Sequence, residues 1–173
     1  NLKISLHHLG KKINPDKDIV FLYLTGHGSA DHTLLIQMQP LSLNDLTPQD
    51  VKAYLDDAGI RWRIIVISAC YSGGFIETLQ NEHSLILTAA APHKASFGCS
   101  NENEHTYFGE ALRNSLDNQP FQYIPSFVQA MQAIGEREQS EKLIPSEPQL
   151  FVGNQMREKL KLLTNSAEHL SPT

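Results

Sequence analysis

The chain has 173 residues, of which 40% are hydrophobic and 19% charged, and its formal net charge is −5 at neutral pH. This length and composition are typical of one globular domain and exclude an intrinsically disordered chain. The acidic balance, with no offsetting cluster of Lys and Arg, argues against a nucleic-acid partner. No apolar run reaches the roughly 18 residues of a membrane-spanning helix. The opening residues show no signal peptide, so the sequence leaves the cellular location open.

The first 26 residues predict a helix followed by a buried strand. Four apolar side chains recur at spacings of four, three and four, and they form one stripe of an amphipathic helix: Leu2, Leu6, Leu9 and Ile13. After a break at "NPDKD", residues 19–26 are continuously apolar, β-branched or aromatic. Such a run predicts a strand that is covered on both faces, as in parallel sheets.

The rest of the chain continues the alternation of helices and strands. Thr47 and Pro48 fit the cap and first residue of a helix within residues 44–59. Further strands are predicted at 61–69, 84–91 and 148–153, and further helices directly after Cys70 and at 106–116, 124–138 and 154–163. The alternation predicts an α/β fold with a mostly parallel sheet. We expect one domain over residues 1–165 and a polar, frayed tail over residues 166–173.

Two residues with catalytic potential follow two of the predicted strands. His27 stands in "LTGHGS" after the first strand, and Cys70 stands in "SACYSGGF" after the second, 43 residues later. In open parallel sheets, ligands bind outside the carboxyl ends of the strands. Because neighbouring strands lie about 4.8 Å apart, His27 and Cys70 would share one cleft if their strands are neighbours.

The pair has the chemistry of a thiol nucleophile with an acid–base partner. A following helix, amides exposed near Gly73 and Gly74, and the imidazole of His27 would all favour the Cys70 thiolate. The N–H groups of Gly28 and Cys70 could form an oxyanion hole, which is typically worth about 3 kcal/mol per donor. We therefore predict acyl transfer through a Cys70 thioester, with His27 as proton donor to the leaving amine.

Other interpretations fit the sequence less well. Singly, such a cysteine is commonly a small buried hydrophobe. A metal site of His27, Asp31 and His32 has a spacing that fits no helix face. The nucleotide-binding patterns G-x-x-x-x-G-K-[ST] and G-x-G-x-x-G and the serine-hydrolase pattern G-x-S-x-G are all missing, so neither a cofactor nor a metal is predicted. The second cysteine, Cys99, is interpreted as an incidental free thiol.

Several segments together resemble the legumain family of cysteine peptidases, the asparaginyl endopeptidases. The resemblance covers about residues 18 to 153 and is carried by "LTGHGS", "SACYSGGF", "TAAAPHKASFGC", "TYFGEAL" and "PQLFVG". It implies a three-layer α/β/α caspase-like fold, with His27 and Cys70 as the catalytic pair. It also implies a peptide or protein substrate, cleaved after Asn or Asp.

The resemblance further implies where the substrate pocket lies. Ser96 and Glu110 fall where the family lines the pocket for the residue before the scissile bond, and their oxygens could hold an asparagine side-chain amide. Ser68 stands where legumain has an acidic residue. The family's first strand and helix have no counterpart from Asn1 onwards, so we expect a further segment or a second chain to complete the sheet. Two alternatives stay open: an inactive caspase-fold binding or scaffold module, and a transamidase or ligase that uses the same thioester.

Overall fold

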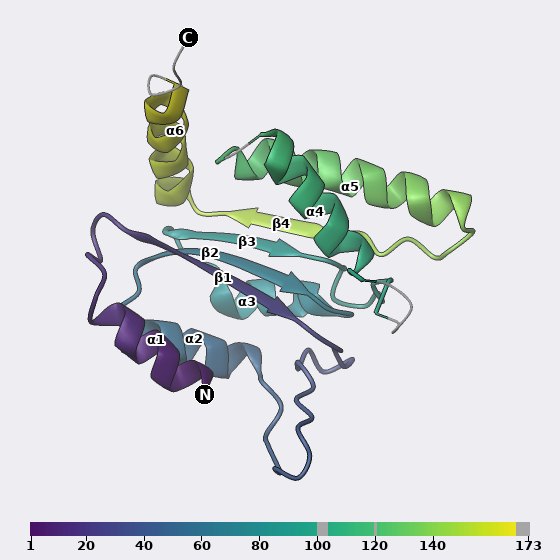
Figure 1. The fold of residues 1–173 in the computed structure, drawn as a ribbon, viewed down its shortest axis with the longest axis horizontal. Helices are drawn as coiled ribbons and strands as arrows, with labels where there is room; N and C mark the ends of the chain where they lie inside the picture. Colours follow the sequence, from purple (N-terminus) through teal and green to yellow (C-terminus); the bar gives the residue numbers. More distant parts are fainter. Residues whose placement is uncertain (100–103, 120, 169–173) are drawn as a thin grey trace.

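The centre of the molecule is a four-stranded sheet with its strands in chain order (Figure 1). The computed structural model describes residues 1–99, 104–119 and 121–168. The strands are β1 (Ile19–Thr25), β2 (Trp62–Ser68), β3 (Ser84–Thr88) and β4 (Gln149–Val152). The first three are parallel to one another and β4 is antiparallel to β3. The predicted mostly parallel sheet is therefore confirmed.

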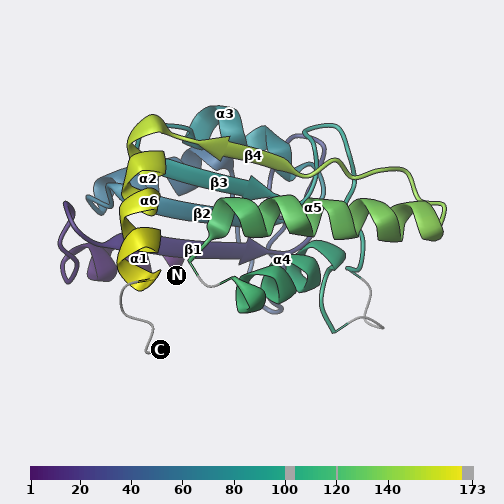
Figure 2. The ribbon, with the colours of Figure 1, turned by 90° about the horizontal axis from the view of Figure 1, so that it is seen from above.

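Helices cover both faces of this sheet and complete three layers. On one face lie α1 (Leu2–Gly10), α2 (Pro48–Asp57), the 3-10 turn η1 (Ser72–Gly74) and α3 (Phe75–Leu79). On the other lie α4 (Tyr107–Asn118), α5 (Tyr123–Ser140) and α6 (Asn154–Glu168). Seen from above, α4 lies over the β1 side of the sheet (Figure 2). Within the described residues, no helix combines the length and the apolarity that crossing a membrane requires.

Alternate side chains of the central strand β2 point to opposite faces of the sheet and contribute to the hydrophobic core on each face. Ile65 and Ile67 pack with the side chains of α1, α2 and α3, while Ile64 and Val66 pack with those of α4, α5 and α6. Successive residues of a strand point to opposite faces, so a strand buried on both faces must be apolar at every position. The continuous apolar run of residues 61–69 therefore predicted the buried strand correctly.

The same argument was wrong for β1, which was predicted to be covered on both faces. Its side chains alternate between covered and exposed, and Phe21 and Tyr23 expose 46% and 41% of their surface. The physical reason is its position, because β1 is the edge strand and no described strand pairs with its other side. Phe21 finds one aromatic neighbour there, Tyr123, with ring centroids 6.1 Å apart.

Helix α2 begins where its capping residues predicted. The Thr47 hydroxyl accepts a hydrogen bond from the Asp50 amide, and the Asp50 carboxylate accepts one from the Thr47 amide. This reciprocal pair is a capping box. Because the box fixes the first turn, the helix begins at Pro48 rather than at residue 44.

The ends of several other elements differ from the predictions. The first helix ends at Gly10, so Ile13 packs against the core from outside it. The third strand ends at Thr88, and α6 continues to Glu168, past the predicted start of the tail. After Cys70, one residue in the left-handed conformation, Tyr71 with φ of 58°, precedes the turn η1. The helix predicted directly after Cys70 is therefore displaced from it.

Candidate active site

The register of β1 and β2 places His27 and Cys70 level with each other. Thr25, the last residue of β1, lies beside Ser68, the last residue of β2. The Gly26 amide donates to the Ser68 carbonyl oxygen at 3.3 Å, which extends the pairing beyond the strands. His27 and Cys70 each follow two residues after these paired ends, so they leave the same rim of the sheet. The two strands are neighbours, as the shared cleft requires.

Gly28 brings the loop after β1 into contact with the backbone of Cys70. A Cβ atom built on Gly28 would overlap the Cys70 carbonyl oxygen and would lie 3.3 Å from the Ala69 Cβ. Only a residue without a side chain permits this approach. The loop that carries His27 therefore lies directly against the loop that carries Cys70.

Two backbone N–H groups at this contact donate to no other group of the described residues and could bind a ligand. Gly28 faces Leu34 in an antiparallel bridge whose hydrogen bonds are made by the flanking residues, at 2.9 and 3.0 Å. In such a non-hydrogen-bonded pair, the N–H of Gly28 points away from its partner. Within the part of the chain that the structure describes, neither the Gly28 nor the Cys70 amide donates a hydrogen bond. The two donors predicted for an oxyanion hole are thus not taken up by any group in the described residues.

The Cys70 side chain is half-buried, and the polar atoms that contact its sulfur in the described residues belong to Ser96. The Ser96 amide donates to the sulfur at 3.3 Å and its hydroxyl lies 3.8 Å away, while the thiol can donate to the Ser96 carbonyl oxygen at 3.5 Å. The Ser96 amide thus points its N–H at the sulfur, where it could stabilise a negative charge that develops during a reaction. His27 is exposed to solvent, so one member of the pair is open to a substrate and the other is partly sheltered.

One predicted source of thiolate stabilisation is wrong. The amides of Gly73 and Gly74 were expected to face the sulfur, but they donate to the carbonyl oxygens of Ala90 and Tyr71 at 2.8 and 3.1 Å. The Gly74 amide closes the short-range hydrogen bond of the turn η1, whereas the Gly73 amide binds the segment that follows β3. The Ser96 amide, which the sequence did not single out, occupies the place expected for them.

The three residues predicted to line the substrate pocket have different surroundings. Ser96 lies against the sulfur, as described. Ser68 is only 1% exposed, and its hydroxyl hydrogen-bonds to the Thr106 hydroxyl at 2.8 Å, at the start of α4. Glu110, in the first turn of α4, forms an ion pair with Arg137 at 3.0 Å. The structure thus brings Ser96 to the sulfur, while Ser68 and Glu110 make contacts within the scaffold.

A cavity of about 570 Å³ opens beside this site, between β1 and α4. Tyr23 and Thr25 line it from β1, while Cys99, Thr106 and Arg113 line it from the opposite side. Thr25 and Thr106 connect it to the rim, because Thr25 is the residue paired with Ser68 and Thr106 binds the Ser68 hydroxyl. Tyr23 and Arg113 were not predicted from the sequence. The alternation of β1 could have identified Tyr23, because the odd-numbered positions of this strand line the cavity.

Cys99 lies closer to the site than its predicted incidental role implied. Burial raises the pKa of the Cys99 thiol, and the nearby Cys70 raises it further, although a hydrogen bond with Ser96 acts in the opposite direction. The side chain is half-buried and lines the cavity. Cys99 is therefore held as a protonated thiol near the Cys70 sulfur.

The residues considered for a metal site are engaged in local structure instead. Asp31 accepts a hydrogen bond from the Ser29 hydroxyl at 2.5 Å, and the His32 ring lies 3.2 Å from the Tyr71 carbonyl oxygen. Over residues 1–99, 104–119 and 121–168, no group of three or more His, Cys, Asp or Glu could hold a metal ion. The local geometry therefore gives no support to a metal centre at His27.

Comparisons with known proteins agree with this arrangement. The sequence model described as the peptidase C13 family matches residues 6–144, whereas no curated protein matches the chain in sequence. The crystal structure of caspase-1 from Spodoptera frugiperda is similar, with a TM-score of 0.64 and 14% sequence identity. The match covers 88% of this chain and 66% of the caspase chain, slightly less than two thirds. At this identity the likeness concerns the fold alone, and it confirms the predicted caspase-like fold.

Proposed function

The chain belongs to the peptidase C13 family, the legumain family that its sequence resembles, and from this premise we propose that it hydrolyses peptide bonds through a Cys70 thioester, with His27 as acid and base. The predicted class of cysteine-type peptidase is confirmed by that membership. The observation that carries the proposal for this chain is that His27 and Cys70 each follow, by two residues, the paired ends of two neighbouring strands. The contact of Gly28 with Cys70 supports it, because it joins the two loops at one point.

The proposed reaction uses the groups at the rim in two steps. The Cys70 thiolate attacks the substrate carbonyl carbon, and the N–H groups of Gly28 and Cys70 stabilise the resulting oxyanion. Protonated His27 gives its proton to the leaving amine, so the C–N bond breaks and a thioester forms. His27 then takes a proton from water, whose oxygen attacks the thioester and releases the acid and the free thiolate. Removing one oxyanion donor in such a site costs roughly 10²–10³ in rate.

The cavity between β1 and α4 is our proposed pocket for the residue before the scissile bond. Its volume of about 570 Å³ accommodates any amino-acid side chain. Ser96 is the predicted pocket residue that lies nearest to the sulfur. We keep the preference for Asn or Asp as part of the proposal, supported by the legumain resemblance.

We also propose that β1 receives a further strand from another segment or a second chain. An edge strand presents unpaired N–H and C=O groups that can pair with an added strand. The topology supports this, because no described strand pairs with the outer side of β1.

A labelling experiment tests the proposed nucleophile. Incubation with a peptide that carries an electrophile after Asn should add one label by intact mass, and this label should be lost in Cys70→Ala but kept in Cys99→Ala.

A set of fluorogenic peptides that differ only in the residue before the scissile bond tests the pocket. A clear preference for Arg or Lys at that position would exclude the proposed pocket. An unlabelled wild-type protein would favour the inactive scaffold alternative, whereas products joined to an added amine would favour the ligase alternative.

A further inference from the structure

We infer that the C-terminal end of α5 positions the loop that holds the Cys70 sulfur, with Tyr107 and Arg137 as its positioning residues. We use "the 91–99 loop" for the segment between β3 and the cavity. The inference rests on the proposed function in that Cys70 is taken as the nucleophile. It concerns residues that, within the described part of the chain, make no hydrogen bond to the sulfur themselves and act on it through this loop.

The 91–99 loop contacts the nucleophile directly. Its Ser96 provides the amide at 3.3 Å from the Cys70 sulfur, and the Lys94 carbonyl oxygen accepts a hydrogen bond at 2.8 Å from the residue after Cys70. A hydrogen bond from an amide favours an anion only while the N–H points at it. The contact between the Ser96 amide and the Cys70 sulfur therefore depends on how firmly this loop is held.

Tyr107 holds the second half of the loop. Its amide donates to the Phe97 carbonyl oxygen at 3.1 Å, and the two aromatic rings lie 6.3 Å apart. Gly98, in the left-handed region with φ of 86°, packs so closely that an added Cβ would come within 2.7 Å of the Tyr107 ring. The main chain from Phe97 to Gly98 thus packs closely against the Tyr107 ring and is hydrogen-bonded to the Tyr107 amide.

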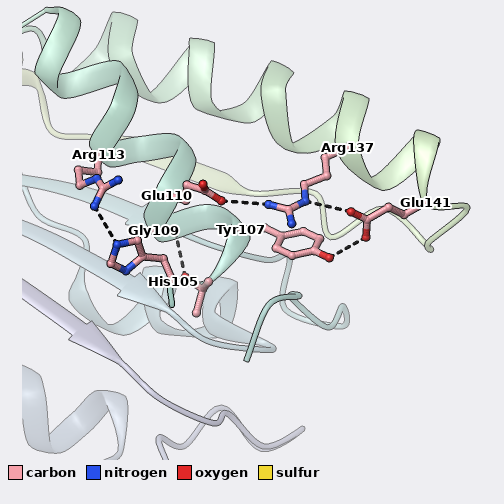
Figure 3. Close-up of polar contacts among 8 residues, drawn as sticks. His105, Tyr107, Gly109, Glu110, Arg113, Arg137 and Glu141 are labelled. Atoms are coloured by element: carbon pink, nitrogen blue, oxygen red, sulfur yellow. Dashed lines mark hydrogen bonds and ion pairs between the residues drawn. The ribbon is translucent and has the colours of Figure 1, made fainter. Parts of the chain in front are cut away.

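Tyr107 is in turn fixed by the last turn of α5 (Figure 3). The Arg137 guanidinium lies over the ring, 3.4 Å from its centroid, and the phenol donates to the Glu141 carboxylate at 2.6 Å. Arg137 also binds Glu141 and Glu110, each at 3.0 Å. A planar guanidinium can stack and donate in its plane at once, which an ammonium group cannot. Arg137 therefore locks the ring between two helices.

The charge states of these groups suit this role. The hydrogen bond to Glu141 raises the pKa of Tyr107, and the same bond lowers the pKa of Glu141. Near neutral pH, Tyr107 is therefore a neutral donor and Glu141 an ionised acceptor. A hydrogen bond between a neutral donor and a carboxylate is stronger than one between neutral groups.

The first half of the loop depends on the same end of α5. Glu138, which is 3% exposed, accepts hydrogen bonds from the Ser146 amide at 3.1 and 3.2 Å. The Ser146 carbonyl oxygen accepts one from the Ala91 amide at 2.9 Å. Both ends of the 91–99 loop are therefore attached to residues 137–141, one through Tyr107 and the other through Ser146.

The positioning role can be separated from a role in stability. Arg137 and Glu141 are more than one third exposed, and ion pairs at such sites contribute little to the free energy of unfolding. The protein should therefore fold without them. What their loss should change is the direction of the Ser96 amide, and so the reactivity of the sulfur.

The test measures alkylation of Cys70 by iodoacetamide as a function of pH, in a Cys99→Ala background, by intact mass. Iodoacetamide needs no substrate pocket, so its rate reports the reactivity of the sulfur itself. In Tyr107→Phe and Arg137→Lys we expect the rate at pH 7 to fall about five- to tenfold and the pH profile to differ from that of the control. Gln132→Ala is the matched control, because Gln132 lies on the exposed face of α5 and bonds only to Glu136 within the described residues.

Alkylation rates and pH profiles equal to those of the control in both folded variants would overturn the inference. Tyr107→Phe keeps the ring and removes only the hydroxyl, so it carries the test if Arg137→Lys does not fold. The two proposals fail separately. If the variants change the alkylation rate but the wild-type protein cleaves no peptide, only the proposed function is contradicted. If the protein is an active peptidase but the variants leave the alkylation rate unchanged, only this inference is contradicted.

Discussion

Gly28 shows how much of the site depends on the size of a single residue. Its backbone touches that of Cys70, so the distance between the two loops is set by the missing side chain. Its N–H, which donates to no other described residue, is also one of the two proposed oxyanion donors. Both the close approach and the N–H donor belong to the backbone, so the side chains of the sequence do not indicate them directly.

We expect Gly28→Ala to lower the rate of peptide hydrolysis by roughly 100-fold, because a methyl group would push the His27 loop away from Cys70 and misplace the reacting groups. Gly26→Ala is the matched control, since a Cβ at Gly26 meets no atom within 4 Å. Steady-state hydrolysis of a fluorogenic peptide measures both variants. Equal rates in the two would show that the contact between the loops is unimportant.

At the scale of elements, the sequence was most informative where a local signal fixes an end. Thr47 and Pro48 identified the start of α2 because a cap and a first-turn proline act within a few residues. The end of β3 and the length of α6 carried no such signal, and both were predicted several residues away from where they lie.

The capping box predicts a measurable contribution to stability. Thr47→Ala removes the hydroxyl that accepts from the Asp50 amide, and we expect the free energy of unfolding to fall by about 1 kcal/mol. Urea denaturation followed by circular dichroism measures this. Ser42→Ala, at an exposed position before the helix, is the control and should leave the midpoint unchanged. A loss of less than about 0.3 kcal/mol in Thr47→Ala would show that the box contributes nothing beyond the packing of α2.

At the scale of the whole molecule, one ion pair links the helical layer of α2 to the sheet. Arg63 of β2 is almost fully buried and bonds to Asp56 of α2 at 2.9 Å. Partial burial pushes the pKa of Asp56 upwards, but hydrogen bonds from Lys52 and Arg63 outweigh it and hold this pKa below its usual value. A group with a lowered folded pKa stabilises the protein above its unfolded pKa, and this contribution is lost as the pH falls through the folded value.

We therefore expect Asp56→Asn to lower the free energy of unfolding by about 1–2 kcal/mol at pH 7, with a smaller difference from wild type at pH 3. The magnitude is discounted because the Asp56 side chain is 40% exposed. Urea denaturation at both pH values gives the comparison. Asp57→Asn is the control, since Asp57 pairs with Lys3 at 3.9 Å on an exposed surface. An unchanged difference at the two pH values would contradict the role of the ionised Asp56.

The sequence by itself determined the order and type of the elements, the buried central strand, and the arrival of His27 and Cys70 at strand ends. These features follow from local rules, because side-chain period, caps and turns act over a few residues. Only the tertiary structure decided that β1 is an edge strand, that Ser68 binds Thr106 rather than facing the solvent, and that Glu110 pairs with Arg137. Each of these depends on which distant segments pack together, and a pattern read along one dimension does not specify such partners. The attachment of the 91–99 loop to the end of α5 is also a contact between distant segments that the sequence did not predict. Tyr107 and Glu141 are 34 residues apart in the chain and meet only after folding.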